Sequence, residues 1–494
     1  MSLLIKAISN PGLRLELLDA AQVRRLHEAT LQVIEETGVR FPSERALTIW
    51  ADHGATVDWE SQIVRAPGQL IEEALAQAPP AYTLAARAPQ QDLPLDGNHV
   101  YAGTDGCGVE ILDLQTGARR RSHLQDVAEI ARVADYLPQV AFHWVAVSAQ
   151  DKPAQTRSLH ELQAIWANST KHVQTESVYS VAEAQAAMEM AAAVAGGDRE
   201  LRQRPPLSIM QCTAPPLGHD GGSLDAALIA AAAGVPTGFM TMTSCGSTAP
   251  ATLAGNLVVG NAEVISGLAL LQLACPGAPV FYAAAQSAMD VRSGAYTGGG
   301  PEDFLFGAAT NALADFYDVP LSMGSFATGA KKPNWQAGVD NSLSTFMASV
   351  AMSDMLLGVG LLHGSRIWSY AQMLMDCEIF DLVRQMMRGI EVSDETLALD
   401  VIAAVGPGNN FLAHKHTRRH ARELWRPNYM DRRPYEVWEA EGDGAVQWAT
   451  AEAQRILATH EPEPLDPQLS AELQRMINRL EQSEIQGASH ASPA

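Results

Sequence analysis

From about residue 140 onward, short apolar runs alternate with longer Ala- and Leu-rich segments at a regular spacing. Seven runs start about 30 to 40 residues apart, at 140–148, 172–175, 207–212, 237–243, 279–284, 320–324 and 356–362. Continuous apolar strands joined by helical crossovers indicate a parallel sheet in an α/β fold. Seven such units, with an eighth strand expected near 410–413, favour a closed TIM (β/α)8 barrel over an open sheet. Neither a G-x-G-x-x-G after the first strand nor a P-loop is present, so the usual nucleotide-binding signatures are missing.

The segments on either side of these units have a different character. Residues 1–95 are expected to form an N-terminal α+β extension with helices at 19–37, 43–53 and 67–78. The barrel domain is assigned to 96–420, beginning with a hairpin over 100–113, and C-terminal helices to 421–482. The last segment, 483–494, has the composition of a disordered tail.

Composition narrows the partners and the compartment. The chain of 494 residues carries a formal net charge of −22, which disfavours nucleic acid and anionic membrane surfaces. We expect no membrane span, because the longest apolar candidate, 224–242, is interrupted by Asp225, Gly234 and Pro236. Five scattered cysteines without a C-x-x-C pair, and an N-terminus without signal-peptide features, predict reduced thiols and a cytoplasmic protein.

The loop after the sixth of these strands contains an unusual set of side chains. The strand ends near Gly324, and a Gly- and Ala-rich stretch leads to Lys331, Lys332, Trp335 and Gln336 before a helix begins. Barrel enzymes place their chemistry on such strand-to-helix loops. A solvated basic turn is an equally good interpretation of this loop alone.

The other predicted strand ends are rich in hydroxyls, amides and aromatic rings and poor in carboxylates. This profile suits a small organic cation or zwitterion better than hydrolysis by a pair of carboxylates. Tyr282, Trp335, Trp368 and Tyr370 could form an aromatic box around a quaternary ammonium, although each alone is more commonly a packing residue. Further strand-end candidates are Ser148, Gln150, Gln211, Thr213, Thr243, Gln286, Asp290, His363 and Arg366.

Other motifs have ordinary interpretations beside functional ones. Glu176 ends an apolar strand, as either a buried site carboxylate or the partner of a barrel arginine. Cys245 could be a nucleophile but more commonly is a small buried hydrophobe. The run 297–300 opens a helix and could hold an anion or form a lid. His414 and His416 lack carboxylate or thiol support as a metal pair, so we expect no metal bound by this chain.

Several stretches in a fixed order carry a family resemblance. They are 106–117, 249–263, 276–279, 299–302, 331–338, 394–401, 406–417 and 431–435. Through them the chain resembles the trimethylamine methyltransferase (MttB) superfamily over most of its length. The resemblance implies a TIM-barrel enzyme that passes a methyl group from a methylated amine to Co(I) of a corrinoid (cobalamin) carried by a separate protein.

The 331–333 loop places the chain within that superfamily. The archaeal trimethylamine enzymes carry a pyrrolysine in this region, whereas this sequence has standard residues there. The chain therefore resembles the non-pyrrolysine branch, whose members demethylate quaternary amines such as glycine betaine. It departs from the branch pattern Asp-Ser-Lys-x-Pro-Asp, because Thr328-Gly-Ala-Lys-Lys-Pro-Asn334 lacks both acids.

The sequence thus predicts a corrinoid-dependent methyltransferase that is a homo-oligomer and acts on a small methylated amine. The predicted catalytic residues are Lys331, Lys332 and Glu176, and the predicted substrate-binding residues are Tyr282, Gln286, Trp335, Gln336, His363, Trp368 and Tyr370. Lys331 or Lys332 could instead anchor a substrate carboxylate. Two other hypotheses stay open: a barrel lyase that forms a Schiff base on Lys331 or Lys332, and a non-catalytic binder of methylated amines.

Overall fold

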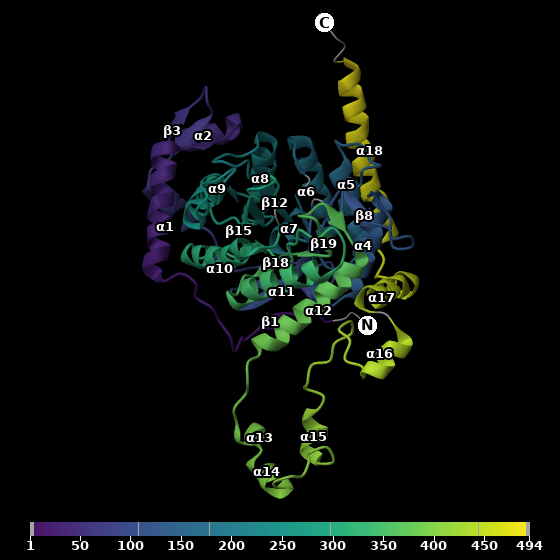
Figure 1. Cartoon of the computed structure of the whole chain (residues 1–494). Helices are drawn as coiled ribbons and strands as arrows, with labels where there is room; N and C mark the ends of the chain where they lie inside the picture. Colours follow the sequence, from purple (N-terminus) through teal and green to yellow (C-terminus); the bar gives the residue numbers. More distant parts are fainter. Residues whose placement is uncertain (1–3, 107, 177, 297, 443, 491–494) are drawn as a thin grey trace.

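A closed barrel of parallel strands forms the centre of the molecule (Figure 1). The computed structural model describes residues 4–106, 108–176, 178–296, 298–442 and 444–490, and within these ranges eight strands make up the barrel. In order around the barrel they are β7 (His99–Thr104), β10 (Val140–Trp144), β11 (His172–Thr175), β12 (Leu207–Cys212), β13 (Thr237–Thr241), β15 (Val280–Ala284), β17 (Leu321–Gly324) and β18 (Met355–Val359). Strand β18 pairs in parallel with β7 and closes the ring, so the predicted TIM (β/α)8 fold is confirmed.

The strand that completes the barrel is the first one, β7. The expectation of an eighth strand at 410–413 is wrong, because those residues lie in turns between helices α14 (Leu399–Val405) and α15 (Lys415–His420). Strand β7 pairs with both neighbours, Tyr101 opposite Met355 and Ala102 opposite Val140. The hairpin predicted over 100–113 is also wrong, since β8 (Glu110–Leu112) pairs instead with β9 (Arg119–Arg121) and β20 (Ile367–Trp368).

A helix follows each barrel strand and covers its outer side. These helices are α4 (Leu124–Tyr136), α5 (Arg157–Asn168), α6 (Val181–Ala195) with α7 (Asp198–Gln203), α8 (Gly221–Ala233), α9 (Leu253–Ala274), α10 (Pro301–Phe316), α11 (Trp335–Val350) and α12 (Tyr370–Met387). Among the described helices, α9 has the length and apolar composition of a membrane span, which the expectation from sequence overlooked. Within α9, 78% of the apolar window is buried against the barrel and the N-terminal extension.

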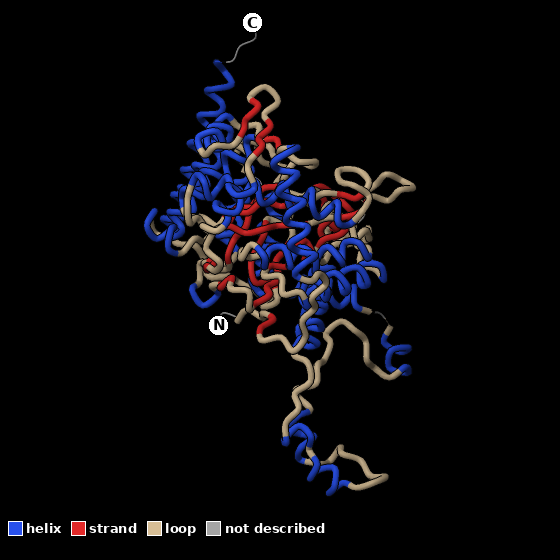
Figure 2. Tube along the Cα trace, turned by 90° about the vertical axis from the view of Figure 1, so that its left-hand side faces the viewer, coloured by secondary structure: helices blue, strands red, loops and turns tan. Residues whose placement is uncertain are grey.

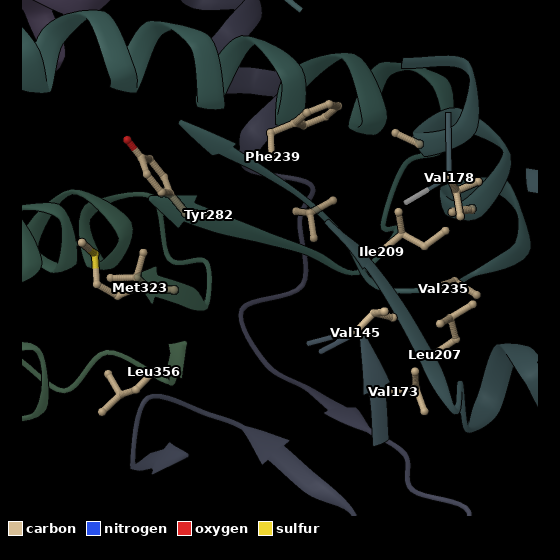
Figure 3. Packing of buried hydrophobic residues seen from close by; sticks show 14 of the residues in the cluster. Val145, Val173, Val178, Leu207, Ile209, Val235, Phe239, Tyr282, Met323 and Leu356 are labelled. Atoms are coloured by element: carbon tan, nitrogen blue, oxygen red, sulfur yellow. The ribbon is translucent and has the colours of Figure 1, made fainter. Parts of the chain in front are cut away.

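Side chains alternate between two apolar layers along each barrel strand. One set fills the barrel interior, including Tyr101, Phe142, Trp144, Met240 and Phe281. The other set faces the helices, and Figure 3 shows Val173, Leu207, Ile209, Phe239, Tyr282, Met323 and Leu356 in this outer layer. Burying each large apolar side chain contributes roughly 1.5–3 kcal/mol. Because both faces are buried, the strands read as continuous apolar runs in the sequence.

The N-terminal extension packs against the barrel and its helices. Its elements are β1 (Ile8–Ser9), α1 (Ala20–Gln32), a π-helical turn (Val33–Thr37), β2 (Val39–Arg40), α2 (Glu44–Asp52), β3 (Thr56–Asp58), β4 (Ile63–Arg65), α3 (Gly68–Leu75), β5 (Tyr82–Leu84), a 3-10 turn (Pro89–Gln91) and β6 (Leu93–Leu95). Strands β2, β4 and β3 form a small antiparallel sheet, and β1 adds antiparallel to the start of β7. The helices lie where the sequence predicts them.

After α12 the chain leaves the barrel as an extended arm, residues 388–434 (Figures 1 and 2). The arm carries the short helices α13 (Asp394–Leu397), α14 (Leu399–Val405) and α15 (Lys415–His420). Helices α16 (Tyr435–Glu441), α17 (Ala445–Thr459) and α18 (Pro467–His490) follow, and α17 and α18 return to pack on α4, α5, α6 and α12. Helix α18 extends into the predicted disordered tail 483–494, of which 491–494 lie outside the described residues.

Candidate active site

A cavity opens at the carboxyl ends of the barrel strands, where barrel enzymes place their sites. Its wall includes residues from nearly every strand end and from the loops above them. The lining residues are Asp105, Trp144, Glu176, Cys212, Met240, Met242, Ala285, Gln286, Tyr296, Asp303, Gly324, Ser325, Ala327, Leu357, Leu361, Gly364 and Ser365. Methionine, leucine and alanine side chains form the apolar part of this wall, and carboxyl and aromatic groups form the rest of its functional surface.

The carboxyl group of Asp105, one residue beyond β7, is held in a fixed position. Its Oδ1 accepts the backbone N–H of Gly106 at 2.8 Å, and its Oδ2 accepts the hydroxyl of Ser365 at 3.1 Å. Burial, and after it the charge of Glu176, raises the pKa of Asp105 to about 7. This carboxyl therefore changes its charge near neutral pH and is stabilised in its ionised form by a nearby cation.

Glu176 and Asp303 add two more carboxyl groups to the cavity wall. Glu176 follows β11, is 5% exposed, and accepts a long contact from the thiol of Cys212 at 3.8 Å. Asp303 lies in the first turn of α10, where its Oδ2 accepts the backbone N–H of Gly299 at 2.9 Å. Burial raises the pKa of Asp303 to about 7. The cavity wall therefore carries three carboxyl groups in an apolar surround.

Two aromatic rings, Trp144 and Tyr296, also line the cavity, and each has a glycine against it. A Cβ added at Gly106 would lie 2.3 Å from the ring of Trp144, and one added at Gly364 would lie 2.7 Å from the ring of Tyr296. Both glycines thus permit a close approach of backbone to ring. Trp144 is 2% exposed at the base, while Tyr296 is 44% exposed and stands at the rim. Aromatic faces and carboxylates together suit an organic cation.

Gln286 is fixed by hydrogen bonds on both ends of its amide. Its Nε2 donates to Oδ1 of Asn256 at 2.9 Å, and its Oε1 accepts the hydroxyl of Thr310 at 2.9 Å. The amide is 3% exposed and belongs to a network that links α9 to α10. It therefore offers the cavity a rigid polar edge.

No basic side chain lines this cavity among the described residues, which include every lysine and arginine of the chain. The nearest ones in sequence point elsewhere. Nζ of Lys331 donates to the carbonyl of Gly329 at 2.5 Å, and Nε of Arg366, 61% exposed, lies 3.6 Å from Oε2 of Glu110. The cavity thus lacks a positive anchor for an anionic group.

Two of the ten site residues predicted from the sequence, Glu176 and Gln286, line the cavity. The lysine loop begins at its wall with Ser325 and Ala327, but then turns outward, so Lys331, Lys332, Trp335 and Gln336 are exposed. Backbone bonds from His363 to Ala330 and from Gly364 to Thr328 hold the loop in this course.

The remaining predicted residues lie outside the cavity wall. Tyr282 and Trp368 are buried in the outer apolar layer, and Tyr370 lies at a separate hollow beside Arg120 and Glu129. His363 is half-buried at the rim, where burial and the charge of Lys331 hold its pKa below the usual range. The four aromatic residues Tyr282, Trp335, Trp368 and Tyr370 therefore do not form one box around a ligand.

The weaker motifs are also placed by the structure. Thr297 lies outside the described residues; of the rest of 297–300, Gly299 already gives its N–H to Asp303. Cys245 is buried beside Asn256, whose Nδ2 lies 3.3 Å from the sulfur. His416 lies with His420 and Glu395 on the arm in a partly exposed group with metal-ligand spacing, and its backbone N–H donates to Nδ1 of His414 at 3.2 Å.

The fold and the cavity define a (β/α)8-barrel protein with an anionic, aromatic-walled site at its strand ends. The chain belongs to the trimethylamine methyltransferase (MTTB) family, whose model matches residues 1–484, so the sequence resemblance is confirmed. It is 35% identical over 457 residues to the trimethylamine methyltransferase MttB of Desulfitobacterium hafniense (strain DSM 10664 / DCB-2), covering 92% of each chain.

Two further similarities bear on the family and the fold. The chain is 33% identical over 464 residues to the glycine betaine methyltransferase of Desulfitobacterium hafniense (strain Y51), covering 93% of this chain and 96% of the relative. The crystal structure of the Methanosarcina barkeri monomethylamine methyltransferase superposes with a TM-score of 0.54 at 12% identity, covering 90% and 88% of the two chains. That likeness confirms the barrel architecture. The chain therefore belongs to a family of methyltransferases.

Proposed function

We propose that this protein transfers a methyl group from a small methylated ammonium ion to Co(I) of a corrinoid carried by a separate protein. The observation that carries the proposal is the strand-end cavity, in which Asp105, Glu176 and Asp303 surround an apolar space beside Trp144 and Tyr296. A quaternary ammonium cannot donate a hydrogen bond, so its recognition depends on charge and on aromatic faces. This cavity offers both.

The chemistry makes modest demands on the protein. The carbon–nitrogen bond breaks, its electron pair stays on nitrogen, and a neutral tertiary amine leaves without needing a proton. The electron pair for the new cobalt–carbon bond comes from Co(I), the methyl acceptor. The protein's residues hold one methyl group toward the cavity opening and exclude water from it. The carboxyl groups must bind the cation weakly enough to release the product. The raised pKa of Asp105 favours this, because the group is partly neutral near pH 7.

The proposed site follows from the cavity wall. It comprises Asp105, Glu176 and Asp303 for charge, Trp144 and Tyr296 as aromatic faces, and Gln286 as a polar edge. We do not include Lys331 or Lys332, whose side chains are exposed beyond the wall, and a Schiff-base lyase built on them lacks a pocket around the amine. The corrinoid partner is proposed to approach the rim at Tyr296.

The test uses free cobalamin, reduced to Co(I), in place of the unidentified partner. The protein is mixed with trimethylamine, tetramethylammonium, choline or glycine betaine, and the loss of Co(I) absorbance is followed. We expect at least one quaternary ammonium to give enzyme-dependent loss that the double variant Asp105→Asn/Glu176→Gln abolishes. Binding of these ions without any methyl transfer would instead support a non-catalytic binder and contradict the proposal.

A further inference from the structure

We infer that the cavity selects methylated ammonium ions that carry no carboxylate, such as choline-like cations, and rejects glycine betaine and other zwitterions. This inference rests on the proposed function and narrows its substrate class. It departs from the glycine betaine-like substrate that the family resemblance implies. The observations behind it are the three carboxyl groups on the wall and the missing positive anchor.

Three carboxyl groups, those of Asp105, Glu176 and Asp303, line the same small cavity, where their negative charges repel one another. Asp105 is 7% exposed and Glu176 is 5% exposed, and the charge of Glu176 disfavours ionisation of Asp105. A quaternary nitrogen relieves this repulsion. The carboxylate of glycine betaine sits only two bonds from its nitrogen, so it would enter the same space and restore the repulsion.

Among the residues that the structure describes, no basic side chain lines the cavity to meet a substrate carboxylate. The side chain of Lys331 turns back to the carbonyl of Gly329, and Arg366 pairs with Glu110 at the surface. Arg120, at the separate hollow near Tyr370, is bound to Asp113 at 3.0 Å and to Asp126 at 2.7 Å. Buried ionic groups without a partner bind poorly, because desolvation is not offset.

A hydroxyl tail fits the same wall. Ser365 already donates its hydroxyl proton to Asp105, and Gln286 is engaged at both ends of its amide. Each oxygen of the Asp105 carboxyl accepts one hydrogen bond, and carboxylate oxygens have further acceptor sites for an alcohol or an amide N–H. They repel another carboxylate. Choline and small neutral amides of the same size thus match the cavity in both charge and hydrogen bonding.

The experiment compares three ligands with one trimethylammonium head: choline, N,N,N-trimethylglycinamide and glycine betaine. Binding to the full chain is measured by calorimetry at pH 8, and methyl transfer to Co(I) cobalamin is measured separately. We expect choline and the amide to bind at least 100-fold more tightly than glycine betaine. Glycine betaine binding as tightly as choline overturns the inference, while methyl transfer from it leaves the proposed function intact. Failure of all three ligands to bind or react overturns the inference, and it overturns the proposed function as well only when trimethylamine and tetramethylammonium also fail to react.

Variants separate the wall from the lysine loop. Glu176→Gln is expected to weaken choline binding and to spare glycine betaine, so that the preference narrows by tenfold or more, whereas Glu176→Asp should retain it. Lys331→Ala should leave the preference unchanged. If Lys331→Ala instead selectively weakens glycine betaine, that lysine is a carboxylate anchor and the inference is wrong. Thermal melting of each variant confirms that it is folded.

Discussion

The hydroxyl of Ser365 donates to the carboxylate of Asp105 across the seam where the barrel closes, with 3.1 Å between Oγ and Oδ2. Asp105 follows the first barrel strand, β7, and Ser365 follows the last, β18. Closure of the barrel therefore brings together two residues that are 260 positions apart in the sequence. This contact fixes the carboxyl group that dominates one side of the cavity.

Asp105 should make cation binding depend on pH. Its pKa is raised to about 7, so the group is neutral below that pH and charged above it. Affinity for choline should rise between pH 5 and pH 8, measured by calorimetry in a constant-ionic-strength buffer. Asp303 titrates in the same range, so Asp105→Asn should reduce the rise and Asp105→Asn/Asp303→Asn should remove it. A flat profile in the unaltered protein would contradict this role.

The same carboxyl group links cation binding to stability. Because its folded-state pKa lies above the ordinary value of 3.8, the folded chain holds a proton there that the unfolded chain releases, and this contribution to stability declines as pH rises from about 4 to 7. A bound cation offsets the decline. The increase in melting temperature caused by choline should therefore grow with pH. The Ser365→Ala variant loses a hydrogen bond to the ionised carboxylate of Asp105, so the midpoint of this pH dependence should move to higher pH.

Trp144 should recognise charge through its ring face. Trp144→Leu keeps apolar volume but removes the π-face, which contributes roughly 0.5–2 kcal/mol to cation binding. Choline should bind about twofold to thirtyfold more weakly. The matched ligand is 3,3-dimethylbutan-1-ol, in which carbon replaces the charged nitrogen, and its weak binding should not change. Equal losses for both ligands would show that Trp144 acts by packing alone.

Gly106 should matter for the position of that ring. An added Cβ would lie 2.3 Å from the indole, closer than side chains allow, so Gly106→Ala must displace Trp144. Methyl transfer should fall by tenfold or more while the far-ultraviolet circular dichroism spectrum stays unchanged. Gly338→Ala is the control, because a Cβ added at Gly338 has no neighbouring atom within 4 Å. Gly117→Ala would not serve, because Gly117 has a positive φ of 69°. Full activity in Gly106→Ala would contradict the assigned geometry.

Lys171 is a buried lysine that stabilises the far end of the barrel. Its ammonium donates to the carbonyls of Ala134, Leu137 and Val140 at 2.5, 2.7 and 2.6 Å. Lys171→Met leaves these acceptors unpaired, at a cost of about 3–5 kcal/mol. The melting temperature should fall by several degrees, whereas Lys415→Met on the exposed arm should not change it. An unchanged melting temperature in Lys171→Met would show that water replaces the amine.

Burial lowers the pKa of Lys171 to about 8, below the ordinary 10.5 of the unfolded chain. The unfolded chain therefore holds more protons between these values, and the contribution of this group to stability rises with pH across about 8 to 10.5. When the pH is raised from 8 to 10, the melting temperature of Lys171→Met should fall more, or rise less, than that of the unaltered protein. Identical differences would contradict the shifted pKa.

Much of the fold could be predicted from the sequence because strand and helix lengths repeat. The spacing of apolar runs identified seven barrel strands, and family motifs pointed to the same architecture. Strand β7 falls within the hairpin predicted over 100–113, because no local signal shows that its partner is β18, some 250 residues away. For the same reason Asp105 is not predicted as a site residue, because β7, the strand that it follows, is not predicted to belong to the barrel.

The site could be predicted only in part, for a reason of geometry. Glu176 and Gln286 lie just beyond their strands, where the loop direction takes them to the cavity. Tyr282 lies within β15, where alternate residues face opposite sides, and its neighbours Phe281 and Ala283 take the inward positions. A strand buried on both faces gives no polar alternation to settle which residues point inward. Trp144 was missed for the same reason, and Tyr296 because it lies on a loop without a periodic pattern.

The most direct test of the central claim measures both products of one methyl transfer. The protein is incubated with choline and Co(I) cobalamin, and N,N-dimethylethanolamine is quantified by mass spectrometry beside the loss of Co(I) absorbance. We predict one-to-one stoichiometry in the unaltered protein and loss of both signals in Asp105→Asn/Glu176→Gln. Absence of a demethylated amine from choline, from N,N,N-trimethylglycinamide and from tetramethylammonium, with the protein folded, would contradict the account.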